Sequence, residues 1–149
     1  MVSNEEYEKM QQQEDTTDVP SEGAKKKEFF ANWQVGGETY QMKLRTSEQL
    51  ELEKIYKKNL FSLMGDADNL PSLSTMLQIT HAAMKPYHHG IKLRDVENLY
   101  SKYIDEGGSM LQFYVDVYMR IYAVSGFFSS SMEEDLSRSM EKISEEMNQ

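Results

Sequence analysis

The chain has 149 residues, with 25 acidic and 16 basic side chains and no cysteine. The length suits one domain, and the net charge of −9 disfavours binding to the phosphate backbone of nucleic acids. The lack of cysteine excludes disulfides, thiol nucleophiles and thiolate metal ligands.

Acidic residues concentrate at the two ends of the chain. Residues 1–24 hold seven acids and one base, and residues 129–149 hold six acids and two bases, whereas the segment between them is nearly neutral. Few apolar side chains lie in residues 1–28, so we expect an acidic, disordered extension there. The chain begins without the basic and apolar stretches of a signal peptide, and no apolar run is long enough to span a bilayer. We therefore expect a cytoplasmic protein.

Residues 29–44 alternate apolar and polar side chains with the period of a β-strand. Gly36-Gly37 divides the segment, and two glycines allow the positive φ angles that a two-residue hairpin turn needs. The sequence therefore predicts an antiparallel hairpin that offers one face to a core, namely Trp33, Val35, Tyr40 and Met42. A lone hairpin is marginal in water, so we expect helices to cover it.

The first of four expected helices spans residues 47–64. Thr46 and Gln49 fit a capping box at its start, and Gly65 is expected to end it. Its apolar side at helical spacing is Leu52, Ile55, Tyr56, Leu60, Leu63 and Met64.

Two further helices are expected in the middle of the chain. One begins around Pro71 and ends before Pro86, because the residue preceding a proline is pushed out of the helical region. Its apolar stripe is Leu73, Met76, Leu77, Thr80, Ala83 and Met84. The other covers residues 93–105 and ends at Gly107-Gly108, with a buried face of Val96, Leu99, Tyr100, Tyr103 and Ile104.

The fourth expected helix, residues 109–125, is apolar over most of its circumference. Between Met110 and Val124 the only polar residues are Gln112, Asp116 and Arg120. A surface helix of a small domain buries a stripe little more than about 100° wide. This helix is therefore either the central one, wrapped by the others, or it shares part of its face with another chain. Three tyrosines spaced four apart suit such a half-exposed interface: Tyr114, Tyr118 and Tyr122.

Residues 129–149 form a further expected helix, acidic and amphipathic, with a methionine-rich seam. Apolar side chains recur at helical spacing, namely Met132, Leu136, Met140, Ile143 and Met147. Such a helix is marginal alone. It either folds back on its own domain, orders on a partner, or stays disordered. The candidates for partner binding are Met132, Leu136, Met140 and Ile143.

The sequence contains no pattern typical of an enzyme or a cofactor site. Phosphate-binding loops, His-Glu-x-x-His and Gly-x-Ser-x-Gly are missing. Pro86 separates His81 from His88 and His89, and the loop at Asp66 lacks the glycine and the final glutamate of a calcium loop. We expect no catalysis, cofactor or metal. A modest basic patch is outweighed by the acidic ends, so we also expect no nucleic acid to bind at Lys43, Arg45, Lys54, Lys57 and Lys58.

The order of these elements resembles the tail assembly chaperones of long-tailed phages and prophages of Gram-positive bacteria. The segment WQVGGETYQMKL at residues 33–44 is similar to their opening hairpin. Similar segments are LEK at residues 52–54, LRDVENL at 93–99 and residues 118–127. The resemblance covers about residues 29–128, and the chain departs from it in having an acidic extension before the hairpin.

The predicted elements together give an α+β, mainly α fold, with a hairpin packed on about four helices over residues 29–128 and an amphipathic helix in 129–149. The resemblance implies a non-enzymatic protein of the host cytoplasm, absent from the mature virion, that binds the tape measure protein, keeps it soluble and helps recruit tail tube subunits. A homo-oligomer is compatible with a shared helix face. The alternative is a cytoplasmic adaptor or regulatory protein that docks on one partner through its C-terminal helix.

Overall fold

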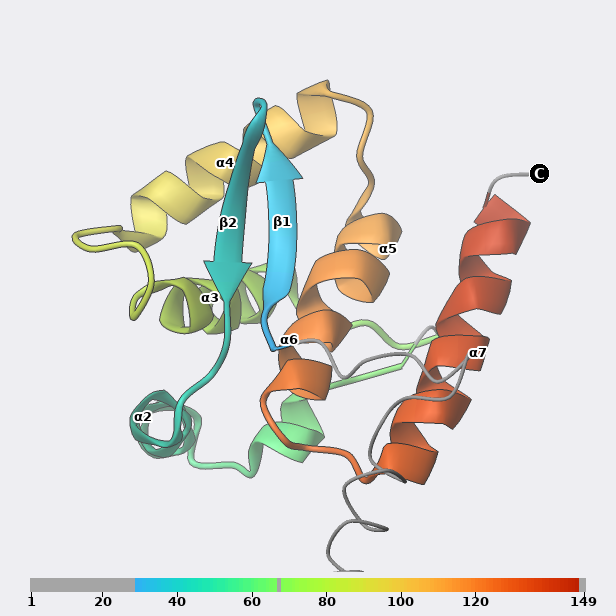
Figure 1. Ribbon diagram of the computed structural model, residues 1–149. Helices are drawn as coiled ribbons and strands as arrows, with labels where there is room; N and C mark the ends of the chain where they lie inside the picture. Colours follow the sequence, from blue (N-terminus) through green and yellow to red (C-terminus); the bar gives the residue numbers. More distant parts are fainter. Residues whose placement is uncertain (1–28, 67, 148–149) are drawn as a thin grey trace, which may run out of the picture.

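The structure is a computed structural model, and it describes residues 29–66 and 68–147. The expected acidic extension, residues 1–28, lies outside the described residues. An antiparallel hairpin comes first and helices follow it, so the α+β, mainly α fold is confirmed (Figure 1). No helix in the two described ranges is long and apolar enough to cross a membrane.

The hairpin consists of β1 (Ala31–Val35) and β2 (Glu38–Met42), in the predicted register around Gly36-Gly37. Both glycines have positive φ, 62° and 78°, which only glycine adopts without strain at two successive positions. Alternate side chains are buried, as the period of two predicted: Ala31, Trp33, Val35 and Met42, with Tyr40 half-buried.

Helices hold the hairpin at its turn and along its outer edge. The Gly36 N–H donates to both carboxylate oxygens of Glu106, at 2.8 and 3.2 Å. On the free edge of β2, the Gln41 N–H donates to Nε2 of His88 at 2.9 Å, and the Lys43 N–H donates to the Ala83 carbonyl at 3.0 Å. These bonds pair backbone groups that an edge strand would otherwise leave open.

The helix expected over residues 47–64 is wrong in its second half. The first helix, α2 (Thr46–Tyr56), ends where Lys57 adopts the left-handed conformation, with φ 54°. A short helical turn, η1 (Leu60–Leu63), follows, and the Asn59 side chain accepts from the Phe61 N–H at 2.9 Å. The break turns the chain so that Leu60 enters the core.

Two details of α2 also differ from the expectation. Ile55 is 68% exposed and not on the buried side, because the face that meets the core runs from Leu52 to Tyr56, one turn apart. The expected capping box at Thr46 is not formed, since the N-cap is Arg45 and makes no side-chain bond. The Gln49 amide instead donates to the Leu44 carbonyl at 3.1 Å.

The two middle helices confirm most of the prediction. In α3 (Leu73–Met84), the Ser72 hydroxyl caps the helix by accepting from the Thr75 N–H at 3.1 Å. The expected bounds of α4 (Leu93–Asp105) are those of the structure. Ile104 is an exception on the apolar face of α4, because it is exposed at the last turn.

The central helical segment is built from α5 (Met110–Phe113), the π-helical turn η2 (Tyr114–Tyr118) and α6 (Met119–Val124). Ser109 caps its start, and Gly126, with φ 87°, follows its end, as predicted. The turn η2 contacts both β1 and α3, so this segment is the core helix of the fold. The π-helical geometry was not predicted, and it shows as a bond from the Met119 N–H to the Tyr114 carbonyl.

The last helix, α7 (Ser130–Met147), stands at the edge of the molecule in Figure 1. The Ser129 hydroxyl accepts from the Met132 N–H at 3.4 Å at its start. Phe128 and Met140 belong to the hydrophobic core. Of the alternatives left open by the sequence, the structure therefore has α7 folded back on its own chain.

Candidate functional site

The three tyrosines expected at an interface form a row of neighbouring rings inside the fold, one pair tilted and the other edge-on. Tyr114 and Tyr118 have ring centroids 6.0 Å apart, and Tyr118 and Tyr122 have centroids 5.3 Å apart. The exposed fractions are 4% for Tyr114 and 0% for the other two. The central-helix interpretation is thus confirmed, and the half-exposed interface at these side chains is wrong.

Hydrogen bonds explain how hydroxyl groups can be buried there. Tyr118 donates to the Leu63 carbonyl at 2.7 Å, and Tyr122 donates to the Leu60 carbonyl at 2.8 Å. Both carbonyls belong to η1, so the two hydrogen bonds join this short turn to the central helix. The tyrosines therefore fasten η1 to the central helix and have no ring to offer to a partner.

Burial also fixes the protonation state of these tyrosines. It raises the pKa of Tyr114 and of Tyr122 to about 12, and it raises the pKa of Tyr118 as well, with the neighbouring Tyr122 adding to the effect. A buried phenol is harder to ionise because the low-dielectric interior disfavours the charged form. All three are neutral near pH 7 and are unsuited to acid–base chemistry there.

The seam expected on the C-terminal helix is divided between the core and the surface. Met140 is only 5% exposed, Ile143 is half-buried against the core, and Met132 is 49% exposed. The side chain of Leu136 lies outside the described part of α7. The N-terminal turns of α7 thus present apolar surface to solvent, while its C-terminal half meets the bundle.

Other exposed apolar side chains are Phe29, Leu50, Ile55 and Phe61. Of these, the sequence placed Ile55 on the buried side of the first helix. Phe61 packs edge-on against Phe127, with centroids 5.4 Å apart, so it borders the chain that leads into α7. The break at Lys57 separates Phe61 from α2, and no glycine or proline signals that break.

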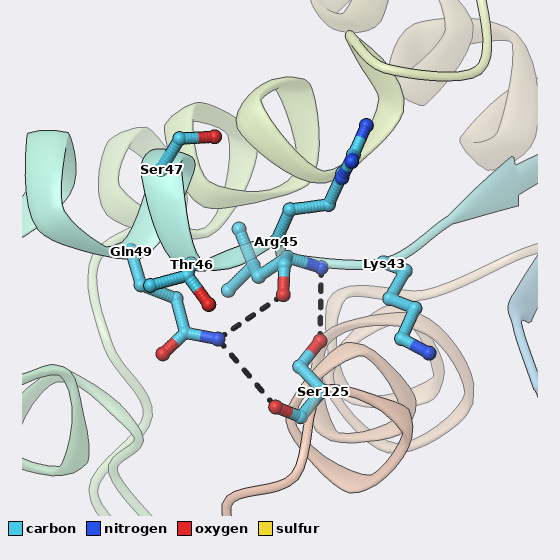
Figure 2. Close-up of a pocket in the computed structure, with 7 residues that line it drawn as sticks. Lys43, Arg45, Thr46, Ser47, Gln49 and Ser125 are labelled. Carbon is cyan, nitrogen blue, oxygen red and sulfur yellow. Dashed lines mark hydrogen bonds between the residues drawn. The ribbon is translucent and has the colours of Figure 1, made fainter.

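A hollow of about 350 Å³ lies between the start of α2 and the end of α6 (Figure 2). The Leu44 N–H donates to the Ser125 hydroxyl at 2.9 Å, and the Gln49 amide reaches the Ser125 carbonyl at 3.5 Å. Figure 2 shows Arg45 extending away from these groups. The hydrogen bonds of Ser125 with Leu44 and Gln49 thus join the start of α2 to the end of α6.

One residue of the basic patch, Lys43, and two of the histidines, His81 and His88, are engaged in the fold. The Lys43 ammonium lies 4.6 Å from the centroid of the Phe29 ring, a cation–π contact. His81 shares a 2.9 Å hydrogen bond with the Ile91 carbonyl, and His88 accepts from β2. In the described residues, no group of His, Asp and Glu is arranged to hold a metal ion.

Comparison with known proteins gives one match. The model of a protein family described as a family of unknown function, DUF6096, matches residues 26–148. No curated protein and no solved structure matches the chain. The match covers the hairpin and every helix within the described residues.

Proposed function

We propose, for a chain that belongs to the family of unknown function DUF6096, the role of a phage tail assembly chaperone. It would bind the tape measure protein, keep it soluble and help recruit tail tube subunits. The resemblance of residues 29–128 to such chaperones supports this proposal. The structural observation that carries it is α7, an acidic helix that leaves Met132 exposed while Met140 anchors it.

The chemistry of α7 suits a protein that holds a long helical client. Methionine is flexible and polarisable, so an exposed methionine adapts to varied apolar surfaces. Exposed acids on the same helix, among them Glu134, Asp135, Glu145 and Glu146, keep a complex with an apolar client soluble through net charge. Since the three tyrosines are enclosed, α7 replaces them as the proposed point of contact.

The proposal includes where and how the protein acts. It acts by binding, without catalysis, in the host cytoplasm, and it leaves the assembled tail. In the hollow, the Gln49 amide is hydrogen-bonded to the carbonyls of Leu44 and Ser125, which supports a structural role for these polar groups. Mass spectrometry of purified virions should find the tail proteins and not this chain.

Co-expression tests the proposal directly. With the tape measure protein of the phage or prophage that encodes the chain, we expect soluble client and co-purification of the two proteins. Met132→Asp should reduce the recovered client several-fold, because it places a charge on the exposed seam, whereas Met132→Leu should retain it. Absence of co-purification, with no gain in client solubility, would contradict the proposal.

A second candidate is an adaptor that docks α7 on one folded partner. The exposed start of α7, with Met132, is the observation that favours it. The two functions differ in stoichiometry, because a long client holds many copies whereas an adaptor forms a complex of fixed composition. Light scattering of the purified complex therefore distinguishes them.

A further inference from the structure

Helix α7 is attached to the rest of the fold through a small part of its length. Among its described side chains only Met140 is buried, and Ile143 and Met147 are half-buried. By contrast, α3 buries seven of its twelve residues. The side chains at the described positions between residues 130 and 135 are exposed.

This attachment is weak enough to be reversed by a competitor. Burial of one methionine side chain shifts the equilibrium between detached and attached α7 by roughly ten- to several-hundredfold. A half-buried isoleucine adds less, and an isolated helix of this length is marginal in water. A second helix with a similar seam can therefore compete with α7 for the same surface.

The chain before α7 remains fixed if α7 leaves. The Phe127 ring lies 4.7 Å from that of Tyr122, centroid to centroid, and Phe61 packs against both Phe127 and Phe128. These contacts belong to η1, α6 and the connecting loop. Release of α7 after Ser129 thus leaves the aromatic cluster and the central helix in place.

We propose that the bundle surface under Met140 is a docking surface for amphipathic helices, and that α7 is its intramolecular occupant. A helix of the client displaces α7 from it, so this inference rests on the proposed function. The chemistry of α7 defines the partner. We expect a helix that resembles α7: flexible apolar side chains three or four residues apart, small polar residues beside them, as Ser137 and Ser144 are in α7, and acids on its outer face.

The probe for this surface is a labelled peptide of residues 130–147, added to the full chain. Met140→Asp in the chain should detach α7, because a carboxylate is costly to bury. We expect the peptide to bind this variant at least about tenfold more tightly than the wild-type chain, as measured by fluorescence anisotropy. Ser139→Asp is the matched control, since Ser139 is exposed on the same helix, and it should bind the peptide as weakly as wild type.

Two results would overturn the inference. One is a Met140→Asp chain that keeps the emission of buried Trp33 and yet binds the peptide no better than wild type. The other is a Met140→Asp chain whose Trp33 emission becomes that of the unfolded protein, because α7 would then be an inseparable part of the core. A peptide that itself carries Met140→Asp should fail to bind.

The peptide experiment contains no tape measure protein, so its outcome is separate from that of co-expression. If the peptide does not bind but the client co-purifies, the chaperone function stands and the displacement of α7 is rejected. Binding of the peptide without co-purification would retain the docking surface and reject the client. If both succeed, the client should release the bound peptide from Met140→Asp.

Discussion

Tyr118 and Tyr122 connect the central helix to carbonyls 55 and 62 residues earlier in the chain. Such bonds give the buried tyrosine hydroxyls acceptors within the protein. The tyrosines are thus part of the mechanism that places η1, and their rings fill the core beside it.

Removal of one hydroxyl should test this role. Tyr122→Phe keeps the ring but removes its hydrogen bond to the Leu60 carbonyl, and we expect the free energy of unfolding to fall by about 0.5–1.5 kcal/mol. Urea unfolding followed by Trp33 fluorescence measures the change. Tyr100→Phe is the control, because no hydrogen bond of its hydroxyl is found within the described residues, and it should change stability by less than about 0.5 kcal/mol.

The sequence could indicate these tyrosines but not their partners. Their spacing places them on one helix face, and that spacing is equally compatible with a surface or a core. Whether the tyrosines lie in the core or at the surface depends on the position of Leu60 and Leu63, and that position depends on the break at Lys57. Because long-range contacts determine the outcome, periodicity alone left both possibilities open.

Among the elements, α2 ends in an unusual way. Lys57 is the one non-glycine residue with positive φ in the described chain. In this conformation its N–H donates to the Glu53 carbonyl at 2.7 Å and so closes the helix. The left-handed conformation costs roughly 1–2 kcal/mol for a residue with a Cβ, and glycine usually occupies this position.

Glycine at this position should therefore stabilise the fold. We expect Lys57→Gly to raise the free energy of unfolding by about 0.5–1 kcal/mol, after allowance for the greater freedom of glycine in the unfolded chain. Lys58→Gly, one residue later and without positive φ, should give no gain. Thermal unfolding of the two variants beside the wild type measures the difference, and equal effects would contradict this account of α2.

Elements with local signals were predicted well, and those without them were not. Gly36-Gly37 and strict alternation define the hairpin within a dozen residues, and Pro86 and Gly126 mark helix ends. Lys57 gives no such signal, so α2 was predicted too long. The bonds of Gly36 to Glu106 and of Gln41 to His88 join distant segments and could not be predicted from spacing.

At the scale of the whole molecule, buried tyrosines make the stability of the fold depend on pH in the alkaline range. Burial raises the pKa of Tyr103, as well as those of Tyr114 and Tyr122, to about 12 from the ordinary value of 10.0. The folded chain therefore retains protons that the unfolded chain loses first. Their stabilising contribution is complete below pH 10 and decreases as the pH rises through about 12.

We expect the urea concentration at half-unfolding to decrease between about pH 9 and about pH 12, with tyrosinate absorbance appearing together with loss of structure. Tyr122→Phe removes one of the groups and should make this decrease shallower. A midpoint that is independent of pH over this range would contradict the link between burial and ionisation.

The π-helical turn means that the core helix accommodates one residue beyond a regular α-helical ladder. Deletion of a single residue between Tyr114 and Tyr118 would remove the wide turn and restore that ladder with both flanks in place, whereas a deletion within α5 or α6 would rotate one side of the helix by about 100°. With the deletion in η2, Phe113 would keep its place 5.2 Å from Trp33. Members of the family that are one residue shorter at this point should therefore keep the hairpin side chains that pack on the helix.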